Sequence, residues 1–183
     1  VADKWGVKLG QDQTINFRTR ALPPEQWFDV PGRFGVYSAY TDTVIYARYR
    51  NVSQLNFELY AVGFAEFGRL ISSNSWESWE RDVPVNSAPA RTWSVAVDKP
   101  LNQAGLIRVP VASEGGGALT TGLYLIRVTS PEQSERDFGG TTRHLIAVVN
   151  TNLTYKKSER ESLVWATDLQ SGREIPAGSV TVY

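Results

Sequence analysis

The stretch TVIYARYRNVSQLNFELY, Thr43–Tyr60, decides the fold class of this chain. It is rich in β-branched and aromatic residues, and in its second half the apolar side chains of Leu55, Phe57 and Leu59 occupy every second position. A period of two places alternate side chains on opposite faces of a β-strand, so that one face can be buried. We therefore expect one strand over Thr43–Arg50 and another beginning at Leu55.

The same alternation recurs outward from this stretch in both directions, and Gly, Pro, Asn and Ser separate the runs. Short strands at such spacings, divided by turn residues, favour an antiparallel, immunoglobulin-like β-sandwich. The further runs are Trp93–Val97, Ile107–Val111, Leu123–Val128, His144–Val149 and Leu163–Leu169, with a shorter one at Leu153–Tyr155.

One short helical insertion interrupts this pattern. Within Ala61–Ile71, the side chains of Phe64, Phe67, Leu70 and Ile71 recur at the spacing of one helix face. The polar run after Ile71 is suited to ending the helix and capping a further turn. We expect an all-β chain with a single helical insertion after the second strand.

Composition excludes several classes of protein. The 183 residues, 42% of them hydrophobic, suffice for a sizeable core. Lys plus Arg and Asp plus Glu both number 19, so no net positive charge exists to attract nucleic acid. The absence of cysteine excludes disulfides and cysteine-ligated metal sites within this chain. No apolar run is long enough to cross a bilayer, so we expect no membrane insertion by this segment.

Residues for catalysis or cofactor binding are not apparent. His144 is the single histidine and lies in a predicted strand, where we interpret it as a strand-end residue facing a loop. A catalytic triad needs a placed base and orienter that nothing in the sequence supplies. The carboxylates fall in charge-mixed segments such as SPEQSERD, Ser130–Asp137, which are typical of a solvated surface. We therefore predict no catalytic, metal-binding or cofactor-binding residues, and a hydrolase with paired carboxylates is the weakest alternative.

The aromatic residues carry one candidate interaction surface. In NSWESWER, Asn74–Arg81, Trp76 and Trp79 are three residues apart and would share one side of a helical turn. Exposed tryptophans mark interaction patches and stack on sugar rings. The alternative is that both tryptophans pin the helical insertion onto the sandwich. An adhesin-like or carbohydrate-binding module that uses Trp76 and Trp79 is the second hypothesis for function.

Proline-rich and glycine-containing segments mark connections. LPPE, Leu22–Glu25, together with VPGR, Val30–Arg33, is typical of a linker, because proline fixes φ and removes a hydrogen-bond donor. DLQSGREIP, Asp168–Pro176, is a turn between two strands in which Gly172 can take a positive φ. Two N-x-S/T triplets begin at Asn51 and Asn152, but such triplets are common by chance.

The order of segments in the second half resembles a known family. TGLYLIRV (Thr121–Val128) and RHLIAVVNTNLTYKK (Arg143–Lys157) are followed by SLVWATDLQSGREIP (Ser162–Pro176) and SVTVY (Ser179–Tyr183). This series is similar to the amino-terminal macroglobulin-domain region of bacterial α2-macroglobulin-like proteins. The element W-x-T-D-L-x-S-G, Trp165–Gly172, is its most specific part. Where the family usually has K-P-V after this glycine, the present chain has R-E-I-P.

Two further segments add to the resemblance. Asp42–Tyr60 is similar to a strand pair of the same family, and Trp5–Pro24 resembles the last strands of a bacterial immunoglobulin-like domain. The resemblance implies three parts: the end of a preceding immunoglobulin-like domain (1–22), a macroglobulin-like sandwich (23–149) and the first strands of the next macroglobulin domain (150–183). Because residue 1 is Val and no Met occurs, we expect the chain to be a segment of a longer protein.

The resemblance also implies a function. Proteins of this family are exported or lie in the cell envelope, and they trap attacking proteases, in many members through a Cys–Gln thioester. This chain has no cysteine, so the thioester would lie elsewhere in the longer protein. The implied role is non-catalytic scaffolding, with neighbouring domains as direct partners and target proteases as partners of the full-length protein. For the end of the chain, we expect Leu163–Leu169 to pair with Val180–Tyr183 and to lean on the preceding domain or on residues 1–20.

Overall fold

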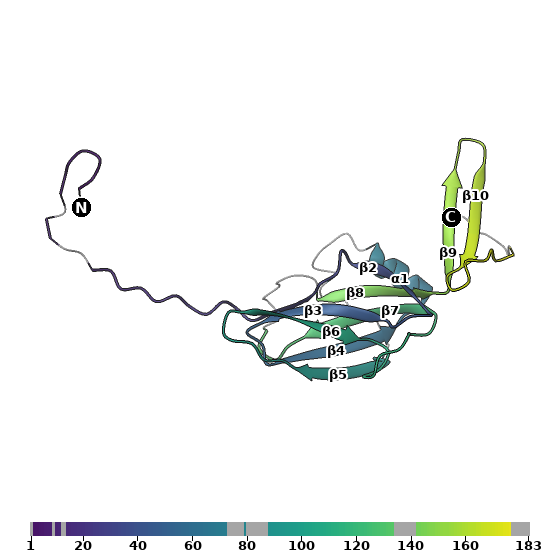
Figure 1. Cartoon of the computed structure of the whole chain (residues 1–183), viewed down its shortest axis with the longest axis horizontal. Coiled ribbons are helices and arrows are strands. Elements are labelled where there is room, and N and C mark those ends of the chain that lie inside the picture. The colour runs from purple at the N-terminus through teal and green to yellow at the C-terminus, as the bar shows by residue number, and fades with distance from the viewer. Residues whose placement is uncertain are drawn as a thin grey trace.

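The computed structural model describes residues 2–8, 10–11, 14–72, 79, 88–133 and 142–176. Within these residues the chain forms ten strands and one helix, shown in Figure 1. They are β1 (Glu25–Phe28), β2 (Phe34–Ser38), β3 (Val44–Arg50), β4 (Gln54–Ala61), α1 (Phe64–Ile71), β5 (Arg91–Ala96), β6 (Ala104–Pro110), β7 (Gly122–Thr129), β8 (Arg143–Val149), β9 (Thr151–Lys157) and β10 (Ser162–Asp168).

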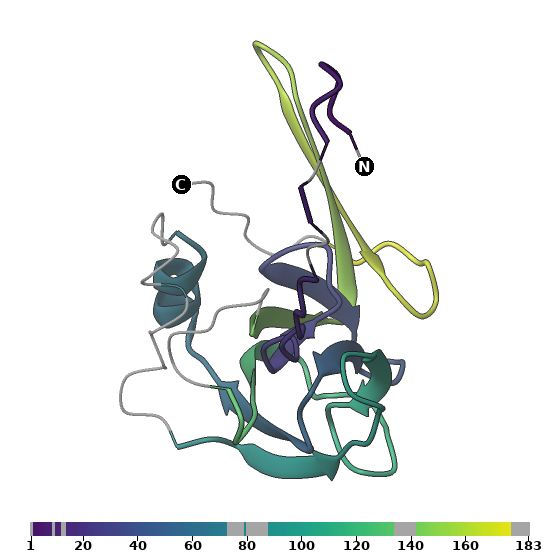
Figure 2. The same cartoon turned by 90° about the vertical axis from the view of Figure 1, so that its left-hand side faces the viewer.

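Eight of these strands form two sheets that pack face to face. One sheet has the order β1-β3-β6 and the other β2-β8-β7-β4-β5. We call these two sheets together the sandwich. The remaining strands, β9 and β10, form a separate two-stranded antiparallel ribbon that we call the hairpin. Figures 1 and 2 both show the hairpin standing out from the sandwich. The β-sandwich predicted from the alternation is confirmed.

Alternation in the sequence builds the core. In β3 the residues Ile45, Ala47 and Tyr49 are buried, while the residues between them are exposed or half-buried. In β4 the ring of Phe57 is fully buried and stacks on that of Trp93, with 5.2 Å between ring centroids. Burial of one apolar face from each sheet provides the main free energy of folding. β8 is buried on both faces, because one face packs into the core between the two sheets and α1 covers the other.

The helical insertion covers the outer face of the five-stranded sheet. Phe67 and Leu70 of α1 are buried against Tyr60, Leu125 and Leu145 of the sheet, which confirms the predicted helix. Phe64 and Ile71, which the spacing placed on the same apolar face, are instead exposed. The buried stripe is therefore narrower than the sequence pattern suggested, and the rest of the apolar face is left open.

Two strands escaped the sequence pattern. β1 lies between the proline-containing segments that were interpreted as a linker, and β2 follows directly after them. β2 pairs with β8 in parallel, so the five-stranded sheet is mixed rather than purely antiparallel. β1 and β2 are not paired with each other, because the chain crosses from the three-stranded sheet to the five-stranded sheet between them. β2 is therefore not one arm of a hairpin, and parallel pairing is open to it.

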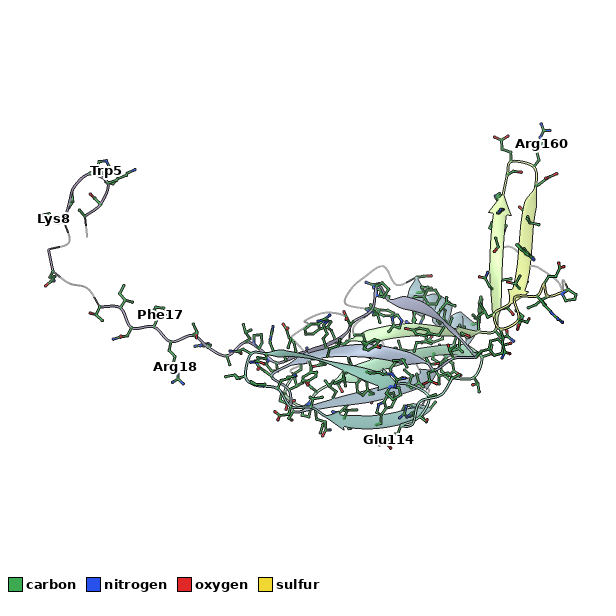
Figure 3. All side chains as sticks on the ribbon, in the orientation of Figure 1. Trp5, Lys8, Phe17, Arg18, Glu114 and Arg160 are labelled. Atoms are coloured by element: carbon green, nitrogen blue, oxygen red, sulfur yellow. The ribbon has the colours of Figure 1, made fainter. Side chains whose placement is uncertain are left out.

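The N-terminal segment stays outside the sandwich. Residues 14–24 form no strand, and among residues 2–8 one isolated bridge joins Ala2 to Lys8. Figure 3 shows Trp5, Phe17 and Arg18 on an extended segment that leads away from the sheets. Ile15 and Phe17 are exposed. The immunoglobulin-like strands that the resemblance implies for residues 1–22 therefore stay a prediction, since the described residues of this segment contain no strand pair beyond that bridge.

Candidate functional site: the two ends of the sandwich

The sandwich meets its flanking segments at two junctions, one at each end of β3. Asn51 follows the last residue of β3, and Tyr40 precedes its first residue by four positions. A seven-residue strand such as β3 spans roughly 23 Å. Figure 1 shows the N-terminal segment leaving at one end of the sandwich and the hairpin rising at the other.

At the first junction, two asparagines hold the N-terminal segment. The backbone N–H of Asn102 donates to Asn51 Oδ1 at 2.6 Å, and Asn51 Nδ2 donates to Asn102 Oδ1 at 3.0 Å. The same two side chains bind the backbone of Leu22: its N–H donates to Asn102 Oδ1 and its carbonyl accepts from Asn51 Nδ2, both at 2.8 Å. We call this arrangement the asparagine clasp. It fixes the point at which the segment reaches the sandwich.

Backbone conformation explains why asparagine occupies both positions of the clasp. Asn51 has a φ of 55° and Asn102 a φ of 67°, values in the left-handed region. Asparagine tolerates this region better than other residues with a Cβ. Beside the clasp, Arg50 forms an ion pair with Glu25 at 2.7 Å, which joins the last residue of β3 to the first of β1.

At the second junction, a single residue connects the sandwich to the hairpin. β8 ends at Val149 and β9 begins at Thr151, so only Asn150 lies between them. The carbonyl of Val149 accepts from the N–H of Ala39 at 2.8 Å, and the carbonyl of Asn150 accepts from the N–H of Leu169 at 2.9 Å. Backbone hydrogen bonds therefore hold the connection from both sides.

A side-chain hydrogen bond spans the same junction. The hydroxyl of Tyr40 donates to Asp168 Oδ2 at 2.7 Å, which links the turn after β2 to the last residue of β10. This bond, together with hydrogen bonds from the backbone and hydroxyl of Ser171, lowers the pKa of Asp168 to about 2. The same bond to the carboxylate raises the pKa of Tyr40 above its ordinary value. At neutral pH the pair is therefore a neutral phenol bound to a carboxylate.

Asp168 also organises the turn that follows β10. Its Oδ1 accepts from the N–H of Gln170 at 3.1 Å, and from the N–H and the hydroxyl of Ser171 at 2.8 Å each. Gly172 takes a φ of 68°, as predicted for this turn. The bonds to both oxygens fix the orientation of the carboxylate.

The hairpin exposes apolar side chains on both of its faces. Residues directly opposite each other in an antiparallel pair share a face. Leu153 lies opposite Ala166 on one face, and Trp165 lies opposite Thr154 on the other. Leu153 is 67% exposed and Trp165 54% exposed. An isolated two-stranded ribbon is marginally stable and ordinarily packs an apolar face against a further element.

The end of the sandwich beside the hairpin is also apolar. Val36 of β2 pairs with Ala147, two residues before β8 ends, and is 62% exposed. Phe64, the first residue of α1, is 82% exposed. It lies close to the same part of the sheet, because the N–H of nearby Val62 donates to the carbonyl of Leu123, and Leu123 pairs with Ala147. The apolar surface of the hairpin thus has a counterpart on the sandwich near its root.

The tryptophans predicted as an interaction surface do not form an exposed pair. Trp79 is 0% exposed and lies in the cluster beneath α1, with the guanidinium of Arg33 5.2 Å from its ring. The prediction of a surface platform is wrong for Trp79, because its ring is used to bury the outer face of the sheet. This matches the alternative in which tryptophan pins the insertion. Trp76 lies outside the described residues.

His144 is buried, and its hydrogen bonds give it a structural role. It is the second residue of β8; Nδ1 donates to the carbonyl of Gly32 at 3.0 Å, and Nε2 accepts from the hydroxyl of Tyr37 at 3.0 Å. Burial lowers its pKa below the ordinary value, so the ring is neutral at physiological pH. A Cβ at Gly35 would lie 2.8 Å from Nε2, so glycine leaves space for the ring.

The predicted pairing of Leu163–Leu169 with Val180–Tyr183 stays a prediction. β10 pairs with β9 over seven residues, so the short run at Leu153–Tyr155 belongs to the longer strand β9. The predicted partner, Val180–Tyr183, lies outside the described residues. Neither β9 nor β10 joins the two sheets of the sandwich.

Other kinds of site are not evident in the described part of the chain. There, no three His, Cys, Asp or Glu side chains gather closely enough to hold a metal ion. No helix in that part is long and apolar enough to cross a membrane.

The junction residues were missed as functional candidates by sequence reasoning. Asn51 appeared in an N-x-S triplet and within the family-like strand pair Asp42–Tyr60, but not as a contact residue, and Asn102 and Tyr40 had no local signal. Asp168 could have been found, because it is the aspartate of the W-x-T-D-L-x-S-G element.

Sequence comparison alone identifies no relative: no protein-family model matches the chain, and no curated protein matches it. Comparison with solved structures does find similar folds. The crystal structure of native alpha-2-macroglobulin from Escherichia coli spanning domains MG0-NIE-MG1 aligns with a TM-score of 0.64 and 14% identity, over 93% of this chain and 53% of that one. The native conformation of E. coli alpha-2-macroglobulin solved by cryo-EM aligns with a TM-score of 0.59 and 13% identity, over 96% of this chain.

A third structure, Salmonella alpha-2-macroglobulin reacted with methylamine, aligns with a TM-score of 0.56 and 12% identity. The present chain spans about half of the first structure, and 11% and 8% of the two larger ones. The resemblance inferred from the sequence motifs is thereby confirmed at the level of fold: this chain is folded like a segment of the bacterial alpha-2-macroglobulins.

Proposed function

We propose that this chain is a non-catalytic structural segment of a bacterial α2-macroglobulin-like protein that traps proteases. Its task is to hold neighbouring domains of the same chain in defined positions. Target proteases are partners of the full-length protein. By the same resemblance, the protein acts outside the cytoplasm, in the cell envelope or the extracellular space.

The observation that carries this proposal is the hairpin. Its covalent connection to the sandwich is the single residue Asn150, and it exposes large apolar side chains on both faces. A ribbon of this kind needs further strands to bury those side chains. We infer that residues 150–183 begin another macroglobulin domain, and that residues 23–149 form the complete one.

The N-terminal segment supports the same arrangement. Ile15 and Phe17 alternate with polar residues and are exposed, as in a strand that lacks its sheet. We propose that residues 1–22 complete a preceding immunoglobulin-like domain. The asparagine clasp would then fix the boundary between that domain and the sandwich.

The test uses the protein encoded by the complete gene. We expect it, after incubation with a protease such as trypsin, to suppress cleavage of a large protein substrate while a small chromogenic peptide is still hydrolysed. This difference in substrate size identifies a trapped protease, because the active site remains free while access is blocked. Equal rates for both substrates, with and without the protein, would refute the protease-trapping role.

A pair of variants connects the segment to that activity. Trp165→Lys places a charge on the hairpin surface that we assign to the next domain, and it should abolish trapping. Thr92→Lys, on the exposed side of the edge strand β5, is the matched control and should leave trapping intact. If both variants trap normally, the hairpin does not build a domain that trapping requires.

A further inference from the structure

The connection at Asn150 is too short to act as a flexible linker, but it does not by itself fix the direction of the hairpin relative to the sandwich. A single residue between β8 and β9 contributes two rotatable backbone dihedrals. Rotation about them would swing the hairpin while its root stayed in place. Something else must therefore hold its angle to the sandwich.

Three hydrogen bonds surround this connection and form a closed ring. Ala39 N–H bonds the carbonyl of Val149 on the sandwich side, and Leu169 N–H bonds the carbonyl of Asn150 on the hairpin side. Tyr40, which follows Ala39, then bonds Asp168, which precedes Leu169, at 2.7 Å. The ring runs from the sandwich through Asn150 into the hairpin, and the Tyr40–Asp168 bond closes it.

The two partners of the closing bond are themselves held in place. Asp168 is paired with Thr151 in the ladder of the hairpin, and its second oxygen is bound by the turn at Gln170 and Ser171. The backbone of Tyr40 donates to Ser38 Oγ at 3.1 Å, within the turn that leaves β2. A hydrogen bond between two anchored groups transmits orientation, whereas one between free side chains would not.

We propose that the Tyr40–Asp168 hydrogen bond is a latch that sets the angle between the sandwich and the hairpin. With the latch closed, the two dihedrals of Asn150 are confined by the ring. With the latch open, the hairpin rotates about Asn150. The inference rests on the proposed function only in that the hairpin would carry the next domain, whose direction the latch would then set.

The latch can be tested by distance measurements on this chain. This chain contains no cysteine, so spin labels can be attached at two introduced cysteines alone. One replaces Arg160, in the loop at the tip of the hairpin (Figure 3), and the other replaces Thr92 on β5. Pulsed electron–electron double resonance then gives the distribution of distances between the label on the hairpin and the label on the sandwich. Tyr40→Phe removes only the hydroxyl and should broaden this distribution. Tyr46→Phe, which removes an exposed hydroxyl from the middle of the sheet, should leave it unchanged.

A double mutant excludes a general loosening of the structure. Asp168→Ala should broaden the distribution at least as much as Tyr40→Phe, and Tyr40→Phe added to Asp168→Ala should cause no further change. A distribution in Tyr40→Phe as narrow as that of the parent chain would overturn the proposal, as would additive broadening in the double mutant. Either result would leave protease trapping by the full-length protein unaffected, so the two proposals fail separately.

Discussion

At Asn102 a single residue combines a left-handed backbone conformation with three hydrogen bonds of the clasp, two to its side chain and one from its backbone N–H. Its φ is 67°, and it contacts both Asn51 and Leu22. Asn102→Ala loses the side-chain bonds and forces alanine into the left-handed region, so we expect the free energy of unfolding to fall by about 1–3 kcal/mol. Asn102→Gly loses the same side chain but adopts this φ freely, and should be milder. Chemical denaturation measures the free energy of unfolding of both variants. An equal decrease in the two would show that backbone strain does not contribute to the effect of Asn102→Ala.

Asp168 allows a prediction about protonation. Its pKa of about 2 lies below the ordinary value of 3.8, first because of the bond from Tyr40 and then because of Ser171. A lowered pKa means that the stabilisation is present above the ordinary value and is lost as the pH falls through about 2. In Tyr40→Phe the pKa of Asp168 should rise towards 3.8, as followed by the carboxyl carbon resonance in NMR. An unchanged pKa in this variant would mean that the turn alone determines it.

Single residues also show where sequence reasoning ends. Asn51 and Asn102 are 51 positions apart, and nothing in either neighbourhood announces that they meet. Asn51 was visible as part of an N-x-S triplet, but its amide nitrogen is engaged in two hydrogen bonds. Trp79 was visible as an aromatic residue on a helical turn, but the pattern alone does not decide which side of that turn is buried.

At the scale of elements, α1 offers an internal comparison between a buried and an exposed apolar residue. Leu70 is buried against the sheet, whereas Phe64 stands in solvent. Leu70→Ala should lower the free energy of unfolding by about 2–5 kcal/mol because it leaves a cavity. Phe64→Ala should change it by less than about 0.5 kcal/mol, as is usual for a surface position. Thermal or chemical unfolding measures the free energy of unfolding of both variants. A similar decrease in Leu70→Ala and Phe64→Ala would mean that the side chain of Phe64 is buried in solution.

The hairpin and the central strand β7 should differ in local stability. β7 lies between β4 and β8 and is largely buried, whereas among the described residues β9 and β10 pair with each other and are extended by a single bridge from Thr167 to Glu174. Local opening requires little free energy where few apolar contacts are lost. Amide hydrogen exchange should therefore be much faster in β9–β10 than in β7 under native conditions. Equal protection of both would show that the hairpin is packed against another part of the chain.

The clearest sequence signal comes from strands with one buried face. β3 and β4 show a period of two, because alternate residues enter the core, whereas β7 and β8 are buried at consecutive positions and were recovered as apolar runs. β1 has four residues between two proline-containing segments, too few for a period to appear. In β2 the glycine at position 35 weakens the strand signal, and its presence is explained by a long-range contact with His144. The parallel pairing of β2 with β8 is likewise invisible in any local pattern.

At the scale of the whole molecule, the sequence predicted a sandwich with separate material at both ends, and the structure places a sandwich between an extended segment and a hairpin (Figure 1). The motif Trp165–Gly172 pointed to the correct fold because it encodes a local structure, the end of β10 and its turn. The junctions could not be derived in the same way, since each depends on residues from two distant parts of the chain.

The position of β3 between the two junctions has a mechanical consequence. Its last residue is adjacent to the clasp that holds Leu22, and the turn before its first residues contains Tyr40. Tension applied to the N-terminal segment is therefore carried along one strand, paired on both sides by β1 and β6, to the root of the hairpin. Ladder hydrogen bonds loaded along the strand direction must shear together rather than open one at a time. With the proposed neighbouring domains attached to these two segments, we expect the sandwich to move as a rigid body and to transmit a displacement from the N-terminal segment to the hairpin.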